Sequence, residues 1–188
     1  MYNEREYWSK RLQTHGAVNT SLNDCVNPLE HDLLIKYIKQ GDVIIDYGVG
    51  GGRLFSCYNE IKPIVQGWDI ADFRKLLDEK KHNYPDFTFH HYYSEKNDLW
   101  NMEYPDENFK VLVSFSVLTH IKPINIEKTI AEMMRISKVA IISAYDDEPL
   151  AITEDNYCFL HDYNKLFDKY KIIEKHKLGK LTYFVIQK

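Results

Sequence analysis

The stretch Val43-Ile-Ile-Asp-Tyr-Gly-Val-Gly-Gly-Gly-Arg-Leu54 (VIIDYGVGGGRL) places four glycines within five positions, shortly after an aliphatic run that ends in Asp46. An apolar run of this length is typical of a buried parallel strand. Glycines after such a strand let the chain turn with positive φ and let the backbone approach a ligand closely. Open α/β sheets bind ligands at the carboxyl ends of their strands. The stretch therefore predicts a strand, a tight turn and a ligand site in one place.

Two nucleotide-binding glycine loops do not match this stretch. A P-loop needs Gly-Lys-Ser/Thr after its glycines, where this chain has Arg53 and Leu54. The dinucleotide fingerprint G-x-G-x-x-G, begun at Gly48, needs glycine or alanine at Arg53. The pattern that does match is acid-x-Gly-x-Gly-x-Gly, with Asp46, Gly48, Gly50 and Gly52 as its members. The acid suits a cationic ligand better than a pyrophosphate, and a plain strand-to-helix turn is the alternative.

The rest of the chain alternates short apolar runs with amphipathic segments, which is typical of an α/β domain. The expected strands are residues 43–47, 64–70, 87–93, 111–116, 139–144, 171–178 and 181–187. A two-residue turn containing Gly179 joins the last two, so the sheet should be parallel except for an antiparallel last strand. The expected helices are residues 4–15, 28–40, 73–80, 126–136 and 163–170. In the fourth helix, Ile and Met form a buried stripe, and Lys128 and Glu132 should face solvent.

Length and composition indicate one soluble domain over residues 1–188. No apolar run reaches the roughly 18 residues that span a bilayer, and the N-terminus is charged, so we expect a cytoplasmic protein without a membrane partner. A formal net charge of −4 argues against a nucleic-acid partner. Cys25, Cys57 and Cys158 lack metal-site spacing and are expected to be reduced core residues, and we expect no metal site. The oligomeric state is left open.

The glycine pattern and Asp69 resemble motif I and the neighbouring acid of the class I S-adenosylmethionine-dependent methyltransferases that act on small molecules. Asp69 ends the second expected strand, 23 residues after Asp46. The resemblance implies that Asp69 accepts both hydroxyls of the donor ribose and that Ile70 packs on the adenine. It also implies a Rossmann-like doubly wound fold with helices on both faces of the sheet, and S-adenosyl-L-methionine as cofactor, with S-adenosyl-L-homocysteine as product. The alternative role for Asp69 is the N-cap of helix 73–80.

The stretch from Asp98 to Phe109, DLWNMEYPDENF, resembles the family segment D-A-x-x-L-P-F-P-D-x-x-F that leads into the fourth strand. The resemblance implies that Asp98 and Leu99 contact the adenine. This chain departs from the family pattern at Glu103, which replaces a proline, and at Lys110, which replaces an acid. Its loop before Asp98 is also longer, so a solvated loop acid is the alternative for this residue.

The segment Val113-Ser-Phe-Ser-Val-Leu-Thr-His-Ile121 resembles the S-x-L-x-H-I/V pattern of many such enzymes. The resemblance implies that backbone carbonyls near Ser114 help to hold the methionyl ammonium and that His120 lies at the mouth of the site. Residues 159–167 resemble the segment that lines the acceptor pocket, and they include His161. A neutral histidine suits removal of a hydroxyl proton, so His120 and His161 are the candidate catalytic residues. A capping or packing role is the alternative for each.

The first forty residues are expected to form a helical extension of the domain. Glu6-Tyr-Trp-Ser-Lys-Arg11 resembles a Tyr-Trp-x-x-Arg segment that folds over the donor as a lid in small relatives. The resemblance implies that Trp8 stacks on the donor and that Arg11 supplies a cation for a carboxylate. Simple docking of the helix through Trp8 and Leu12 is the alternative.

The sequence and the resemblance together predict a methyltransferase that acts on a small polar metabolite. The Asn-Pro-Pro-Tyr signature of amide and base methylation is absent from the chain, which favours a metabolite over a nucleic acid. O-methylation of a sugar-like, phosphorylated or otherwise hydroxylated acceptor is the first expectation. Small-molecule N-methylation is the second, and a methyltransferase-like protein that binds S-adenosylmethionine without turnover is the third.

Overall fold

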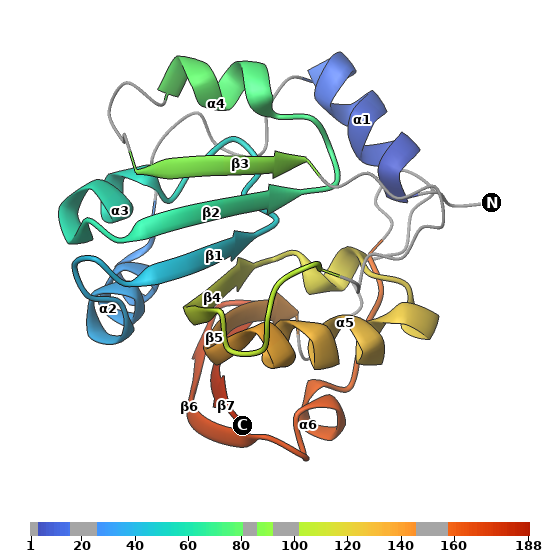
Figure 1. Ribbon diagram of the computed structural model, residues 1–188. Coiled ribbons are helices and arrows are strands. Elements are labelled where there is room, and N and C mark those ends of the chain that lie inside the picture. Colours follow the sequence, from blue (N-terminus) through green and yellow to red (C-terminus); the bar gives the residue numbers. More distant parts are fainter. Residues whose placement is uncertain (1–3, 16–25, 81–85, 92–101, 146–157) are drawn as a thin grey trace. The chain divides into compact units, whose positions relative to one another are not determined.

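Seven strands form a single mixed sheet in a computed structural model that describes residues 4–15, 26–80, 86–91, 102–145 and 158–188 (Figure 1). The order across the sheet is β3-β2-β1-β4-β5-β7-β6. The strands are β1 (Val43–Tyr47), β2 (Ile64–Asp69), β3 (Phe87–His91), β4 (Phe109–Phe115), β5 (Ser137–Tyr145), β6 (Lys171–Leu178) and β7 (Leu181–Gln187). All seven expected strands are present, and the Rossmann-like fold class is confirmed.

Two helices precede β1, and the others fall between strands, as the alternating pattern predicts. They are α1 (Glu4–His15), α2 (Pro28–Tyr37), α3 (Phe55–Ile61), α4 (Arg74–Lys80), the short 3-10 helix η2 (Leu118–His120), α5 (Pro123–Ile136) and α6 (Tyr163–Leu166). α6 is shorter than the expected helix 163–170. The ring of the fully buried Phe167 lies against Tyr163 and Phe184, which turns the chain toward β6 immediately after Leu166.

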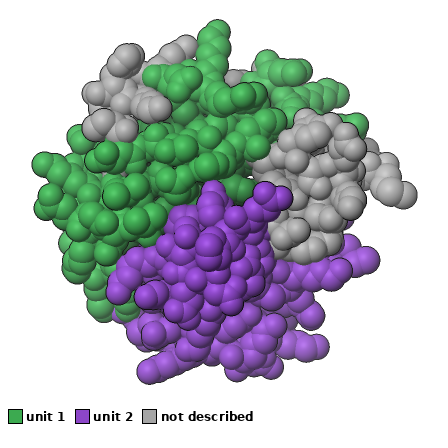
Figure 2. All heavy atoms as spheres, viewed as in Figure 1, with its two compact units in different colours: residues 1–93 green, residues 94–188 purple. Residues whose placement is uncertain are grey.

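Contacts divide the chain into two compact units, Met1–Tyr93 and Ser94–Lys188 (Figure 2). The expectation of one domain stays a prediction. No helix within the described ranges combines the length and the hydrophobicity needed to cross a lipid bilayer.

In the first unit, β1, β2 and β3 run parallel. α2 begins with the predicted capping box, in which Glu30 N donates to Asn27 Oδ1 at 2.9 Å and Asn27 N donates to the Glu30 carboxylate at 3.3 Å. The buried Glu30 also forms a bidentate ion pair with the guanidinium of Arg53, with N–O distances of 2.7 and 2.9 Å. This pair ties the residue after the glycine loop to the first turn of α2.

In the second unit, β4 and β5 run parallel and β7 pairs with both β5 and β6 in the antiparallel sense. The predicted hairpin turns at Gly179, whose φ is +62°. The apolar stripe of α5 is buried as expected, at Ile126, Ile130, Met133 and Met134. Cys57 in the first unit and Cys158 in the second are buried and free, as predicted, and Cys25 lies outside the described residues.

The prediction that Glu132 faces solvent is wrong. Its side chain is 11% exposed because its carboxylate accepts hydrogen bonds from the Arg135 side chain and from Met102 N. Helical periodicity placed Glu132 on the polar side of α5, but a loop covers that side.

Candidate active site

The glycine loop after β1 is held by the end of β2. The amides of Gly48 and Val49 both donate to the carbonyl of Trp68, at 2.7 and 3.2 Å, and Gly52 N donates to Val49 O at 3.0 Å. Gly48, Gly50 and Gly52 have φ values of +81°, +51° and +73°. Because side chains with a Cβ are strained in this region, the alternating glycines are required by the backbone itself.

Neighbouring side chains also leave no room for a side chain at Gly52. A Cβ built on it would lie 3.0 Å from the Phe55 ring and 3.1 Å from Leu77. The third glycine therefore makes room for the packing of α3 and α4 against the loop. Glycine is therefore needed in this loop for two reasons: the positive φ of the turn, and the close packing of α3 and α4 at Gly52.

Asp69 lies at the end of β2, and its side chain holds the loop in place. Its Oδ2 accepts from Gly50 N at 2.9 Å and its Oδ1 accepts from Ala71 N at 3.0 Å. The alternative in which Asp69 caps the following helix does not describe this geometry, because Asp72 accepts the amide of Arg74 at the start of α4. The residue is 8% exposed, and burial raises the pKa of Asp69 to about 6 although backbone hydrogen bonds oppose the shift.

Asp46 is enclosed more tightly than Asp69. It is 3% exposed, and the Tyr58 hydroxyl of α3 donates to its Oδ2 at 3.0 Å. Burial raises the pKa of Asp46 to about 7, against the opposing effects of the Tyr58 hydrogen bond and of the Arg53 charge. The guanidinium of Arg53 is bonded to Glu30 instead. Two buried carboxyl groups at the carboxyl ends of adjacent strands would both ionise more readily beside a cation.

The two histidines of β3 contact β2 and the residue that follows it. His90 Nε2 contacts the Gln66 side chain, and burial lowers the pKa of His90. His91 Nε2 donates to Ile70 O at 3.2 Å, and Ile70 itself is half-buried. The contact of His91 with the Ile70 carbonyl holds the residue that follows Asp69.

The carboxyl end of β4 contains a strained residue and an unusual hydroxyl. Ser116 has a φ of +61°, and its amide donates to the carbonyl and the hydroxyl of Ser143 at 3.0 and 3.1 Å. Ser114 is fully buried, and its Oγ has no hydrogen-bond partner among the described residues. Strained backbone and unsatisfied polar groups are more frequent at functional sites than elsewhere. This is the segment expected to hold the methionyl ammonium.

Two stretches that are far apart in the sequence meet beside His120 in the second unit. We name residues 118–121 and 158–161 together the His120 clasp. Phe159 N donates to Thr119 O at 2.6 Å, and the Cys158 thiol lies 3.7 Å from His120 Nδ1. The expected acceptor segment is therefore fixed directly onto the turn that carries His120.

His161 closes the clasp from the other side. It is 6% exposed, and its Nε2 donates to the Ile121 carbonyl at 3.0 Å. A carbonyl can only accept, so Nε2 carries a proton, and burial lowers the pKa of His161 and favours its neutral form. This geometry favours the packing alternative for His161 over proton removal through Nε2.

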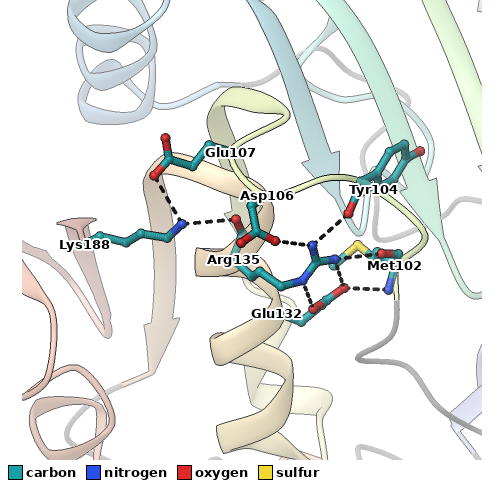
Figure 3. Close-up of polar contacts among 7 residues, drawn as sticks. All are labelled: Met102, Tyr104, Asp106, Glu107, Glu132, Arg135 and Lys188. Atoms are coloured by element: carbon teal, nitrogen blue, oxygen red, sulfur yellow. Dashed lines mark hydrogen bonds and ion pairs between the residues drawn. The ribbon is translucent and has the colours of Figure 1, made fainter.

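Arg135 fixes the loop that leads into β4 (Figure 3). Its guanidinium donates to the carbonyls of Tyr104 and Met102 at 2.8 and 3.0 Å and to Asp106 at 2.7 Å. Two further bonds, both 2.7 Å, join it to the Glu132 carboxylate. Sequence reasoning missed this contact, for which the spacing of Glu132 and Arg135 on one helix face was the only available signal.

The remaining predicted site residues lie in α1 or outside the described residues. In α1, Arg11 Nη1 donates to the Tyr7 hydroxyl at 2.6 Å, and its guanidinium lies 5.8 Å from the ring centres of Tyr7 and Trp8. Asp98 and Leu99 lie outside the described residues. Among the described side chains, no three His, Cys, Asp or Glu residues are grouped so that they could hold a metal ion.

Comparison with known proteins identifies the family. A family model described as a methyltransferase domain matches residues 45–140, which are 96 of the 188 residues. The match includes the glycine loop, Asp69, Ser114 and His120. No curated protein matches this chain in sequence.

Solved structures share the fold at low identity. The Burkholderia thailandensis 1,6-didemethyltoxoflavin-N1-methyltransferase, solved with S-adenosylhomocysteine, superposes with a TM-score of 0.78 at 12% identity over 98% of this chain and 86% of that one. The magnesium protoporphyrin IX methyltransferase of Synechocystis PCC 6803, also with S-adenosylhomocysteine, gives 0.74 at 13% identity over 98% of each chain. The [4+2]-cyclase SpnF gives 0.62 at 12% identity, over 78% of this chain and 57% of that one.

The family match covers half of the chain and contains the glycine pattern, Asp69 and the resembling segments 98–109 and 113–121, whereas residues 6–11 and 159–167 lie outside it. The expectation of S-adenosylmethionine as the methyl donor agrees with it. The chain belongs to the methyltransferase domain family, as a class I S-adenosylmethionine-dependent methyltransferase.

Proposed function

We propose that this protein transfers the methyl group of S-adenosylmethionine to an oxygen of a small, polar, hydroxylated metabolite. The observation that supports a donor site in this chain is the Asp69 carboxylate, bonded to the glycine loop through Gly50 N at 2.9 Å. An ionised carboxylate offers about four acceptor positions. The backbone amides of Gly50 and Ala71 donate to it, and a backbone hydrogen bond from Ile70 also lowers its pKa. The acceptor capacity that these amides leave is available to the ribose hydroxyls.

The donor roles follow from this starting point. Gly48, Gly50 and Gly52 present bare backbone to the donor, Ile70 packs on the adenine, and Asp46 supplies negative charge behind the loop. We assign the adenine edge to Asp98 and Leu99 and the methionyl ammonium to the backbone near Ser114. Trp8 and Arg11 are proposed to cover the donor.

Methyl transfer is an in-line displacement, so the main task of the chain is to align the acceptor and to exclude water. When bound, the donor supplies an electrophilic methyl group on a sulfonium. His120 is proposed to contact the acceptor, and the clasp around it holds the imidazole in a fixed place. His161 supports this arrangement through Ile121. Neither stretch of the clasp contains lysine or arginine, which favours a hydroxylated acceptor over a phosphorylated one.

Two other functions have specific support. The Burkholderia relative is an N1-methyltransferase, which keeps small-molecule N-methylation as the second candidate. A cyclase shares the fold, which keeps a donor-binding protein without methyl transfer as the third. Turnover separates the third candidate from the other two, because the third predicts donor binding without release of S-adenosylhomocysteine in the presence of any acceptor.

Calorimetry with S-adenosylmethionine tests the donor site. We expect Asp69→Ala to weaken binding by roughly ten- to a hundredfold, because hydrogen bonds to a charged acceptor are worth about 1.5–3 kcal/mol each. Asp69→Asn keeps one side-chain oxygen that can accept from Gly50 N but removes the carboxylate. This variant therefore distinguishes loss of loop support from loss of the contact with the ribose. Asp72→Ala is the matched control, since Asp72 is an exposed acid three residues away. Unchanged affinity in Asp69→Ala would refute the assignment of the donor site.

A screen for S-adenosylhomocysteine release then tests the acceptor class. Sugars, phenols, carboxylic acids and amines of small size are offered in turn. The proposal expects release with oxygen acceptors and loss of release in His120→Ala with donor affinity retained. Release with amines alone would favour the second candidate.

A further inference from the structure

We propose that the Cys158 thiol fixes the proton of the His120 imidazole on Nε2, so that His120 meets the acceptor as a hydrogen-bond donor and not as a general base. The contact that supports this is the 3.7 Å approach of Cys158 Sγ to His120 Nδ1. Sulfur contacts of this length are within hydrogen-bonding range. Cys158 is thus a positioning residue that acts through His120.

The position of the shared proton follows from the chemistry of the two groups. A neutral thiol is a weak donor and a poor acceptor, whereas an unprotonated imidazole nitrogen is a good acceptor. If the thiol keeps its proton, it donates to Nδ1, and the single proton of neutral His120 is on Nε2. If the proton moves to the imidazole, both ring nitrogens carry one. Nε2 therefore holds a proton in both favoured forms of the pair.

Backbone hydrogen bonds of the clasp hold the side chains of Cys158 and His120 next to each other. Phe159 N, one residue after Cys158, donates to Thr119 O, one residue before His120, at 2.6 Å. His161 Nε2 donates to Ile121 O at 3.0 Å on the other side of the pair. Cys158 is 5% exposed, so little water competes for the contact. Backbone bonds on both sides thus hold the thiol at the imidazole.

A donor at Nε2 narrows the class of acceptor, and this step rests on the proposed function. Such a histidine can bind and orient an oxygen but cannot take its proton through Nε2. The attacking oxygen must then be ionised before the reaction, as in a carboxylate or an acidic phenol or enol. Attack by this oxygen forms the new C–O bond while the methyl–sulfur bond breaks, and its electron pair stays on the sulfur of S-adenosylhomocysteine. No proton needs to be removed in the step.

Nitrogen NMR of the full-length, ¹⁵N-labelled protein tests the placement of the proton without any acceptor. Long-range proton–nitrogen correlations report which ring nitrogen of His120 carries hydrogen. We expect the Nε2–H form in the wild type and in Cys158→Ser, whose hydroxyl also donates, and a shift toward Nδ1–H in Cys158→Ala. Cys57→Ala is the matched control, because Cys57 is the other buried free cysteine among the described residues and lies in the first unit. An Nδ1–H wild type, or a Cys158→Ala protein with the wild-type pattern, would overturn the proposal.

Turnover supplies an independent arm of the test, with benzoate-like acids and acidic phenols as probes. Glutamine can donate from its side-chain amide but cannot act as a base, so His120→Gln should keep activity within about tenfold of the wild type while His120→Ala loses more. The rate should rise with pH only as far as the probe itself ionises. Equal loss in both variants would contradict the donor role. Absence of turnover with every probe would count against the proposed function, and the NMR result would still decide the placement of the proton.

Discussion

Replacing Asp46 with asparagine should remove much of the pH dependence of folding stability. Burial raises the pKa of Asp46 from 3.8 to about 7, so the folded protein holds a proton that the unfolded chain releases near pH 4. A group whose folded pKa is raised contributes stability that is full below its unfolded pKa and is lost as the pH rises through its folded pKa. The free energy of unfolding should therefore fall from about pH 4 to about pH 7 in the wild type.

The size of the effect follows from the shift. Three pKa units correspond to about 4 kcal/mol, and between about pH 5 and about pH 8 the linkage relation leaves about 2–3 kcal/mol to be lost. Asp69, with its pKa raised to about 6, adds a loss with the same sign at slightly lower pH. The asparagine of the Asp46→Asn variant would stay neutral, and its side-chain carbonyl could still accept from Tyr58. The buried amide of that asparagine adds a cost of about 1–3 kcal/mol that does not depend on pH.

Urea unfolding followed by tryptophan fluorescence at a series of pH values measures the effect. The difference between wild type and Asp46→Asn should change by about 2 kcal/mol or more across this range, in favour of the variant at higher pH. The exposed Asp72, whose pKa is lowered to about 2 by Arg74, gives the control Asp72→Asn, which should follow the wild-type slope. Parallel curves for wild type and Asp46→Asn would show that the carboxyl of Asp46 does not titrate in this range and would refute the reasoning.

Substitutions at three further positions test local packing and backbone geometry by urea unfolding. Gly67→Ala should lose about 1–3 kcal/mol, because a Cβ there would lie 2.6 Å from the Phe87 ring, and an unchanged midpoint would contradict this contact. Arg135→Ala should lose about 2–3 kcal/mol, and Arg135→Lys should recover only part of it because an ammonium cannot replace the planar fork; full recovery would argue against the geometry of Figure 3. Ser116→Gly should unfold no more easily than the wild type, whereas Ser116→Val should lose about 1–2 kcal/mol at its positive φ, and equal stability of the two variants would contradict the strain.

The framework of the fold was predictable because its signals are local. Aliphatic runs such as residues 43–47 define buried strands, and Asn27, Pro28 and Glu30 define the start of α2 through bonds within four residues. Ends of elements were less predictable where tertiary packing decides them. Phe167 ends α6 early because its ring is buried against Phe184, which belongs to a strand that follows later in the chain.

The proposed donor residues were predicted from spacing, but their mutual contacts could not be. Asp69 was identified as the acid at the end of the second strand, yet its bond to Gly50 N depends on the parallel register of β1 and β2, which pairs Asp46 with Gly67. No pattern in the sequence contains that register. The same holds for Cys158 and His120, which are 38 positions apart and lie beside the backbone bond from Phe159 N to Thr119 O.

In the proposed donor site, the cost of burying Asp46 and Asp69 connects the stability of the first unit to donor binding. Both carboxyl groups have raised pKa values, and each raises the tendency of a cation to bind nearby, since a cation favours their ionised forms. A cationic donor should therefore bind more tightly as the pH rises through about 6 to 7, with release of protons, while the ligand-free protein becomes less stable over the same range. Stability and donor affinity should change in opposite directions with pH. If the donor cation did not interact with these carboxyl groups, donor affinity would not rise with pH while stability falls. Calorimetry of donor binding in two buffers of different ionisation enthalpy would detect the released protons directly.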